Sequence, residues 1–199
     1  MRQGRQKFSA VFLDRDGVIT RDVDHLRSKS QLRLLPGAAR AIRRLNDAGL
    51  RVIVVTNQSA IARGWLSPEK LDEIHAELRR RLAKAGAHLD AVYVCPHHPT
   101  EGSGALRRAC RCRKPNPGML LRAARELGLS LPESAMIGDK LSDLEAGRRA
   151  GCATALVLSG QGREALRRIK SRSSAGVADV ICSCFPRAVD WCLQQAAES

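Results

Sequence analysis

The 199-residue sequence predicts an α/β fold with a doubly wound parallel sheet. Two observations support this prediction. Apolar runs rich in β-branched residues alternate along the chain with longer stretches that have the periodicity of amphipathic helices. Each run is also continuously apolar, which is typical of strands covered by helices on both faces of a sheet. We expect five strands from these runs: Ser9–Leu13, Val52–Val55, Leu89–Val94, Ala135–Ile137 and Thr154–Leu158.

Two of the intervening stretches begin with helix-start signals. Ser67 precedes Pro68, and Asn116 precedes Pro117. Each pair places a capping side chain before a proline at the first helical position. After Ser67, a stripe of apolar residues at helical spacing predicts a buried helix face: Leu71, Ile74, Leu78 and Leu82. We expect His75, which lies among charged residues on this helix, to be solvated, and also His88.

The remaining elements complete a single expected domain over residues 1–199. A further helix is expected at about Gly37–Ala48, a weaker strand near Val177–Ile181 and a last helix near Pro186–Gln194. The only extended irregular stretch is Cys95–Cys112, and there are no internal repeats.

The composition indicates which kinds of partner the protein can have. The chain has 34 Lys and Arg against 20 Asp and Glu, a net charge of +14 that favours anionic partners. Aromatic residues make up only 3%, too few for a platform that stacks single-stranded nucleic acid. No apolar run is long enough to span a bilayer, and the basic start is not followed by a signal-peptide pattern. We therefore expect a cytoplasmic protein with no membrane or nucleic-acid partner.

Polar residues follow the expected strands at the point where each strand ends. The first strand is followed by Asp14, the second by Thr56 and Asn57, the third by Cys95 and the fourth by Gly138 and Asp139. Ligands of open parallel sheets bind at the carboxyl ends of the strands. The strand assignment therefore predicts that these residues converge on one crevice.

The carboxylates at this crevice indicate a divalent cation. Asp14 and Asp16 lie two residues apart on extended backbone, so both side chains can point the same way, and Gly17 permits a sharp turn. Two close carboxylates repel each other unless a cation lies between them or one holds a proton. Mg²⁺ prefers oxygen ligands, and Asp139 supplies a third carboxylate.

The irregular stretch carries a second pattern typical of metal sites. Cys95 and His97 form one close pair, and Cys110 and Cys112 form another. Three Cys and one His are a common tetrahedral zinc site, and zinc would stabilise a loop too polar to fold by burial. His98 is an alternative to His97 as the fourth ligand. We expect the other cysteines to be small buried hydrophobes: Cys152, Cys182, Cys184 and Cys192.

Four motifs in order resemble the haloacid dehalogenase superfamily over nearly the whole chain. They are Phe12–Gly17, Thr56-Asn57, Lys114 just before a helix, and Gly138–Asp143. The resemblance implies a Rossmann-like phosphatase fold. The 42 positions from Asp14 to Thr56 (56 − 14) and the interval from Thr56 to Lys114 leave no room for a cap domain.

The resemblance also implies roles for the motif residues. Asp14 attacks phosphorus and forms an aspartyl-phosphate, while Asp16 protonates the leaving oxygen and then activates water. Thr56 and Asn57 donate hydrogen bonds to the phosphoryl oxygens, and Lys114 neutralises their charge.

Mg²⁺ would be held by Asp14, Asp139 and the backbone carbonyl of Asp16, with Asp143 as a further ligand or a residue behind them. Because there is no cap, we expect substrate specificity to come from short loops: Asp22–His25, Ser59–Gly64, and the metal loop with Arg113.

Longer stretches resemble one subfamily, the D-glycero-D-manno-heptose 1,7-bisphosphate phosphatases. They are Thr56–Ser59, Ile61–Gly64, Cys95–Pro99 and Cys110–Met119. The resemblance implies removal of the C7 phosphate in the synthesis of nucleotide-activated heptose for lipopolysaccharide. It also implies that six residues bind the substrate: Asp22, Asn57, Gln58, Ser59, Arg113 and Lys140. Asp22 fits the family's loop, whereas Val23, Asp24 and His25 depart from it.

Three alternatives remain open from the sequence. Histidinol-phosphate phosphatase resembles the chain in all four motifs and in the metal site, although the step of 15 residues from Cys95 to Cys110 (110 − 95) favours the heptose enzyme. Another small phosphoester is a second alternative. A zinc-stabilised nucleic-acid-binding protein would account for the charge. The open site favours a monomer.

Overall fold

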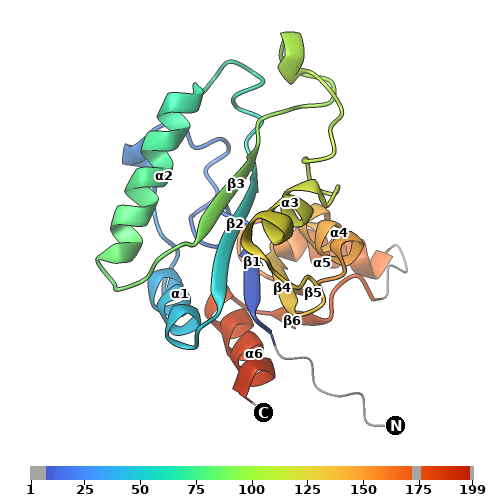
Figure 1. Cartoon of the computed structure of the whole chain (residues 1–199). Helices are drawn as coiled ribbons and strands as arrows, with labels where there is room; N and C mark the ends of the chain where they lie inside the picture. Colours follow the sequence, from blue (N-terminus) through green and yellow to red (C-terminus); the bar gives the residue numbers. More distant parts are fainter. Residues whose placement is uncertain (1–7, 172–175, 198–199) are drawn as a thin grey trace.

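The computed structural model describes residues 8–171 and 176–197. Within them six parallel strands form one sheet in the order β3-β2-β1-β4-β5-β6 (Figure 1). The strands are β1 (Ala10–Leu13), β2 (Arg51–Asn57), β3 (Ala91–Cys95), β4 (Ser134–Gly138), β5 (Ala153–Val157) and β6 (Val180–Cys182). β1 lies in the middle of the sheet, with β2 and β3 on one side and β4, β5 and β6 on the other, so the predicted doubly wound α/β fold is confirmed.

Helices cover both faces of this sheet. One face packs against α1 (Ala38–Asp47), α2 (Pro68–Ala83) and α6 (Phe185–Ala197). The other packs against α3 (Gly118–Leu127), α4 (Leu141–Ala150) and α5 (Gly162–Ser171). Two 3₁₀ turns, Lys29–Gln31 and Gly104–Leu106, lie in loops. None of the helices in the described ranges has the length and apolar character needed to span a membrane.

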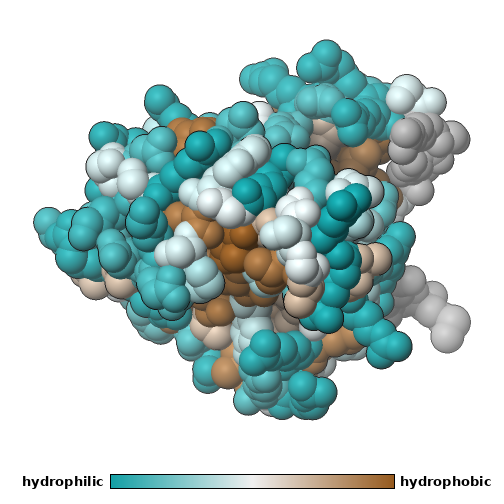
Figure 2. All heavy atoms as spheres, turned by 90° about the horizontal axis from the view of Figure 1, so that it is seen from above, coloured by the Kyte–Doolittle hydropathy of each residue, from teal (hydrophilic) through white to brown (hydrophobic). Residues whose placement is uncertain are grey.

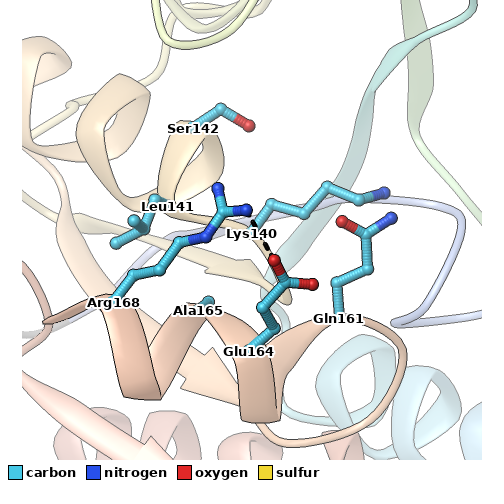
Figure 3. A pocket seen from close by; sticks show the side chains of 7 residues that line it. All are labelled: Lys140, Leu141, Ser142, Gln161, Glu164, Ala165 and Arg168. Carbon is cyan, nitrogen blue, oxygen red and sulfur yellow. Dashed lines mark hydrogen bonds and ion pairs between the residues drawn. The ribbon is translucent and has the colours of Figure 1, made fainter.

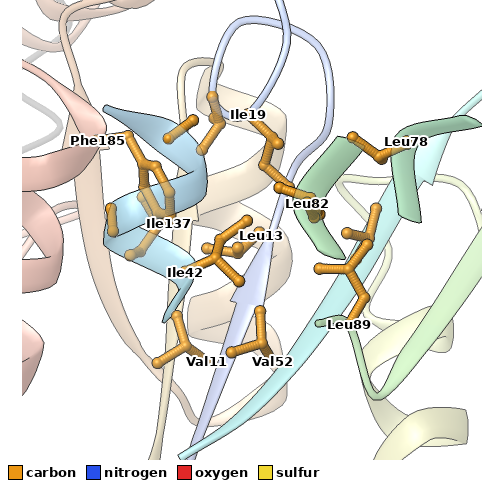
Figure 4. Packing of buried hydrophobic residues seen from close by; sticks show 14 of the residues in the cluster. Val11, Leu13, Ile19, Ile42, Val52, Leu78, Leu82, Leu89, Ile137 and Phe185 are labelled. Atoms are coloured by element: carbon orange, nitrogen blue, oxygen red, sulfur yellow. The ribbon is translucent and has the colours of Figure 1, made fainter. Parts of the chain in front are cut away.

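Alternation along the strands divides the core into two layers. In β1, Val11 and Leu13 face the layer under α1, α2 and α6, whereas Ala10 and Phe12 face the layer under α3 and α4. All four are fully buried because neighbouring strands and helices enclose β1 on every side. Figure 4 shows the first layer, in which Leu13 lies close to Ile42 of α1.

The helix-start signals had different outcomes. Ser67 caps α2 as predicted, since its side chain accepts a hydrogen bond from the backbone N–H of Lys70. The prediction for Asn116 was wrong: Pro117 is the residue before α3, and no side chain caps that helix. The Asn116 amide instead donates to the carbonyl of Cys110 at 2.8 Å, because the loop folds back against the helix start.

The strand and helix ranges agree closely with the expectations elsewhere. The weak strand predicted near Val177–Ile181 lies slightly later, at Val180–Cys182, and the last helix begins one residue earlier and extends beyond Gln194. β6 is an edge strand that pairs with β5 alone, so few sheet partners determine its ends.

The carboxyl ends of the strands lie at one edge of the sheet, at the top of Figure 1. Viewed onto this side, hydrophilic side chains surround a hydrophobic area near the middle (Figure 2). The segments from β1 to α1 and from β2 to α2 lie wholly in the described residues, and only the turn Lys29–Gln31 interrupts them. No cap domain is therefore inserted at either point.

A substitution at Ile42 tests how strongly its packing holds α1 to the sheet. Its side chain is fully buried, whereas the next residue, Arg43, makes only an exposed ion pair with Asp47. We expect Ile42→Ala to lower the free energy of unfolding by about 2–5 kcal/mol, because it leaves a cavity under the helix. Arg43→Ala should change it by at most about 0.5 kcal/mol. Urea unfolding of both variants measures the difference, and equal losses would contradict this packing.

Candidate active site

Three buried carboxylates and one lysine meet where β1 and β4 end. Asp14 follows β1, Asp139 follows β4, and Asp143 lies in the first turn of α4. One carboxylate oxygen of each lies within 4.8 Å of the others. Lys114 Nζ lies 3.0 Å from Asp14 and 2.7 Å from Asp143, and it donates to the carbonyl of Val55 at 2.7 Å. The single positive charge of Lys114 offsets only part of the negative charge of the three carboxylates.

The donor set at this cluster fits a divalent cation with oxygen ligands. Asp139 is fully buried, and its Oδ1 has no hydrogen-bond partner among the described residues. Burial and the charge of Asp14 raise the pKa of Asp139 to about 8 even though Lys140 and the N–H of Gln161 lower it, so its ionised form still needs further positive charge nearby. A cation between Asp14 and Asp139 would supply it, and these oxygens are the ligand type that Mg²⁺ prefers.

Two glycines allow the backbone to approach Asp139. Gly17 has a φ of +86°, and a Cβ there would lie 2.2 Å from Asp139 Oδ2. A Cβ on Gly160 would lie equally close to the same atom. The backbone N–H of Gln161 donates to Asp139 Oδ2 at 2.8 Å, and Ser159 Oγ donates to the carbonyl of Gly17 at 2.6 Å. The loop after β5 thus packs against the turn after β1, and both lie against Asp139.

Asp16 lies apart from this carboxylate cluster. The Arg15 guanidinium binds it with two hydrogen bonds, Nε to Oδ1 at 3.0 Å and Nη2 to Oδ2 at 2.7 Å. Thr20 Oγ1 and Gln58 Nε2 each donate to it at 3.0 Å. Burial alone would raise the pKa of Asp16, but the charge of Arg15 and these hydrogen bonds outweigh burial and lower it. The side chains of Asp14 and Asp16 therefore have separate sets of partners.

The expectation that His75 is solvated was wrong. His75 is buried on α2, and its Nε2 lies 3.2 Å from Arg15 Nη1. Burial, together with the positive charge of Arg15, lowers the pKa of His75 to about 3. A neutral imidazole is the result.

The last residues of β2 and those directly after it hold other side chains of the site in place. Asn57 exchanges two hydrogen bonds of 3.1 Å with the backbone of Lys114, so its amide holds the lysine segment. Thr56 is buried, and its Oγ1 accepts from Gln58 Nε2 at 2.8 Å. Ser59, directly after Gln58, is also buried.

Lys140 is partly exposed beside the carboxylates, whereas Arg113 contacts the metal loop. Lys140 Nζ lies 3.9 Å from both Asp14 and Asp139, and 3.6 Å from Asp22. Arg113 Nη1 donates to the carbonyl of His97 at 3.0 Å. Lys140 and Gln161 also line a pocket of about 220 Å³. Figure 3 shows them with the other lining residues: Leu141, Ser142, Glu164, Ala165 and Arg168.

The four residues of the predicted metal loop converge. Cys112 Sγ lies 3.3 Å from the sulfurs of Cys95 and Cys110, and 3.4 Å from His97 Nδ1. The cluster thus contains His97, whereas His98 Nδ1 accepts from the backbone N–H groups of Thr100 and Glu101.

Of the remaining cysteines, Cys184 is only half-buried, contrary to expectation. The other three are buried as predicted: Cys152, Cys182 and Cys192.

The sequence contained signals for residues that the predictions missed. Gly160 and Gln161 follow β5, so the strand-end rule applied to the fifth strand would have found them. His75 lies four residues after Leu71 and three before Leu78, which places it on the predicted apolar stripe. No sequence pattern pointed to the burial of Arg15.

Comparisons with known proteins agree with this site. Residues 11–85 match the family model of haloacid dehalogenase-like hydrolases, and residues 111–183 match a second model described as HAD-hydrolase-like. Carboxylates after the first and fourth strands of such a fold, with a buried lysine between them, define a hydrolase of this class.

Individual relatives show which phosphatases within this class the chain is similar to. A D-glycero-D-manno-heptose-1,7-bisphosphate 7-phosphatase of Thermosynechococcus vestitus is 41% identical over 186 residues, 92% of this chain and 94% of that protein. A D-glycero-beta-D-manno-heptose-1,7-bisphosphate 7-phosphatase of Bordetella bronchiseptica is 42% identical over 78% of this chain and 84% of its own length.

A solved structure of a phosphatase with the same named substrate is also similar to this chain. The D,D-heptose 1,7-bisphosphate phosphatase of B. bronchiseptica, in complex with magnesium and phosphate, superposes with a TM-score of 0.82 at 37% identity, over 95% of this chain and 100% of that one. The chain belongs to this family of phosphatases within the haloacid dehalogenase-like hydrolases. These similarities favour the heptose family over the histidinol-phosphate and nucleic-acid-binding alternatives.

The neutral His75 predicts a specific loss of stability in acid. Its folded pKa of about 3 lies below the ordinary value of 6.5, so below that pH the unfolded chain takes up a proton that the folded protein does not. Stability contributed by this group is therefore lost as pH falls, by about 2 kcal/mol between pH 6.5 and about pH 4.5. His75→Gln removes the titrating group but keeps a hydrogen-bond acceptor.

Urea unfolding of both proteins at the two pH values measures this effect. The wild type should lose more stability than the variant, and the difference isolates His75 from other acid-sensitive groups. Equal losses would show that His75 titrates normally in the folded protein.

Proposed function

We propose that this protein is a Mg²⁺-dependent phosphatase that hydrolyses the C7 phosphate of D-glycero-D-manno-heptose 1,7-bisphosphate, in the synthesis of nucleotide-activated heptose. The observation that carries the proposal is the buried cluster of Asp14, Asp139 and Asp143 around Lys114, at the carboxyl edge of the sheet. The same reaction is named for relatives about 40% identical over most of their length.

In the first half of the reaction, an oxygen of Asp14 attacks phosphorus while the bond from phosphorus to the ester oxygen breaks. Asp16 gives its proton to that oxygen, and the sugar leaves as an alcohol. Arg15 favours ionised Asp16 in the free protein. A phosphate dianion beside Asp16 opposes this effect, because a nearby negative charge favours the protonated form.

In the second half, water attacks the phosphorus of the aspartyl-phosphate and passes a proton to Asp16. The bond from phosphorus to Asp14 breaks, and inorganic phosphate leaves. Both carboxylates thereby return to their starting states. Lys114 offsets negative charge on Asp14 and on the phosphoryl group throughout, since its ammonium is fixed 3.0 Å from Asp14.

Asp14, Asp139 and the backbone carbonyl of Asp16 would hold Mg²⁺, with Asp143 behind them. When bound, this cation neutralises charge on the phosphoryl oxygens and on the crowded carboxylates. Support comes from the unpartnered Asp139 Oδ1 and from the magnesium and phosphate in the related structure.

The rest of the substrate would lie over the open mouth of the site. Lys140 is partly exposed there beside Asp22, with Arg113 on the metal loop. A bisphosphorylated sugar offers these cations a second anion to bind. Thr56 would donate to the transferred phosphoryl group, and Gln58 holds both Thr56 and Asp16 in place. The amide of Asn57 contributes by fixing Lys114.

The cluster of Cys95, His97, Cys110 and Cys112 would bind one structural Zn²⁺. Three sulfurs and one imidazole nitrogen within 4.8 Å of one another are the donor set of a closed zinc site. We further infer that residues 1–199 form one phosphatase domain that acts as a monomer in the cytoplasm.

Substrate comparison tests the proposed reaction. We expect Mg²⁺-dependent phosphate release to have a higher kcat/KM for heptose 1,7-bisphosphate than for histidinol phosphate or a phosphorylated DNA end. Asp14→Asn should abolish release and keep the fold, because the amide matches the carboxylate in shape but is a poor nucleophile. Malachite-green assays and circular dichroism provide the two measurements.

Two results would contradict different parts of the proposal. Equal or faster turnover of histidinol phosphate would exclude the heptose substrate. Rates like those of the wild type in Asp14→Asn would exclude the covalent intermediate and leave the substrate assignment open.

Metal analysis tests the zinc site. We expect about one tightly bound zinc per chain, and Cys110→Ser should lose it and unfold at a lower temperature, since zinc binding and loop folding are coupled. Cys184→Ser is the matched control, because Cys184 lies outside the cluster. If the purified wild type contains no zinc under metal-free conditions, or if both variants retain it equally, the assignment is wrong.

A further inference from the structure

A buried polar chain connects α2 to the carboxylate that would carry the proton. Its central residue is Arg15, whose side chain has no exposed surface. One edge of the guanidinium, Nε and Nη2, binds both oxygens of Asp16 at 3.0 and 2.7 Å. The remaining nitrogen, Nη1, lies 3.2 Å from Nε2 of His75. Every nitrogen of this buried guanidinium thus has a partner.

The direction of the contact between Arg15 and His75 is determined by chemistry. A guanidinium donates hydrogen bonds and accepts none, so His75 Nε2 must be the acceptor. The ring is then neutral, with its proton on Nδ1. The groups facing it agree with this state: Arg15 and Arg79 disfavour a second positive charge, and the opposing effect of Asp16 is smaller than burial and Arg15.

We propose that His75 is a positioning residue for the reaction, acting through Arg15 on Asp16. This inference rests on the proposed role of Asp16 as proton donor. His75 holds Nη1, and the planar guanidinium then presents its other edge to Asp16 in a fixed orientation.

A neutral acceptor suits this position better than a carboxylate. A second carboxylate beside Arg15 would compete with Asp16 for the guanidinium and add negative charge near a site that already crowds three carboxylates. A residue with no acceptor would leave Nη1 buried without a partner. The guanidinium would then turn toward another acceptor and release one oxygen of Asp16.

Leaving-group dependence distinguishes positioning of the acid from a structural role. An alkyl phosphate such as heptose 1,7-bisphosphate needs a proton on the departing oxygen, whereas p-nitrophenyl phosphate leaves as a stable phenolate. The ratio of kcat/KM for the alkyl ester to that for the aryl ester therefore reports protonation by Asp16. Hydrolysis of the aspartyl-phosphate, which both substrates share, does not enter kcat/KM.

We expect His75→Leu to lower this ratio on the order of tenfold, a fraction of what general acid catalysis supplies. His75→Gln keeps an acceptor near the position of Nε2 and should restore a ratio like that of the wild type. Leu78→Ala is the matched control, because it loosens the packing of α2 without removing a hydrogen bond, and it should leave the ratio unchanged.

The Asp16→Ala variant separates this proposal from the one on which it rests. A large fall of the ratio in Asp16→Ala with none in His75→Leu would overturn the role of His75 and keep that of Asp16. An unchanged ratio in Asp16→Ala would overturn both. A fall in Leu78→Ala as large as in His75→Leu would reduce His75 to a packing role.

One measurement needs no variant and covers the case in which His75→Leu fails to fold. Nitrogen-15 NMR of the wild type between about pH 6 and pH 8 should show His75 neutral, with Nδ1 protonated and Nε2 bare. A protonated Nε2 would overturn the proposal, because such a nitrogen cannot accept from Arg15.

Discussion

The contact on which the site depends is the buried lysine between two buried carboxylates. Lys114 Nζ lies within 3.0 Å of both Asp14 and Asp143, and its backbone is held by Asn57. The ends of β1 and β2, the start of α4 and the segment before α3 therefore meet at one ammonium. Losing either partner of such a pair costs about 3–5 kcal/mol, because it leaves a buried charge uncompensated.

The same crowding of charge explains the shape of the surrounding backbone. A third carboxylate, Asp139, fits only because Gly17 and Gly160 have no Cβ where its oxygens lie. The Asp16 carboxylate is kept apart by Arg15, which gives it a separate cation and separate neighbours. The site thus has two separate groups of carboxylates, one gathered around Lys114 and one bound by Arg15.

Much of this could be predicted from the sequence, because the positions of the strands along the chain and their ends follow from local pattern. Asp14 and Asp139 follow continuous apolar runs, and Ser67 before a proline identified the start of α2. Asn116 carried the same signal and does not cap α3, because its amide finds the carbonyl of Cys110. The burial of Arg15 and His75 was also missed. A polar side chain is buried only if distant residues satisfy it, and that information is not local.

The sequence by itself determined the alternation of strands and helices, the residues at each strand end and the pairs that form the cysteine cluster, since these depend on periodicity and spacing along the chain. Only the tertiary structure decided which histidine joins that cluster, which way the Asn57 amide faces and which partner holds each carboxylate. Those choices are made by hydrogen bonds between segments far apart in the chain. Their geometry exists only once the sheet has brought the segments together.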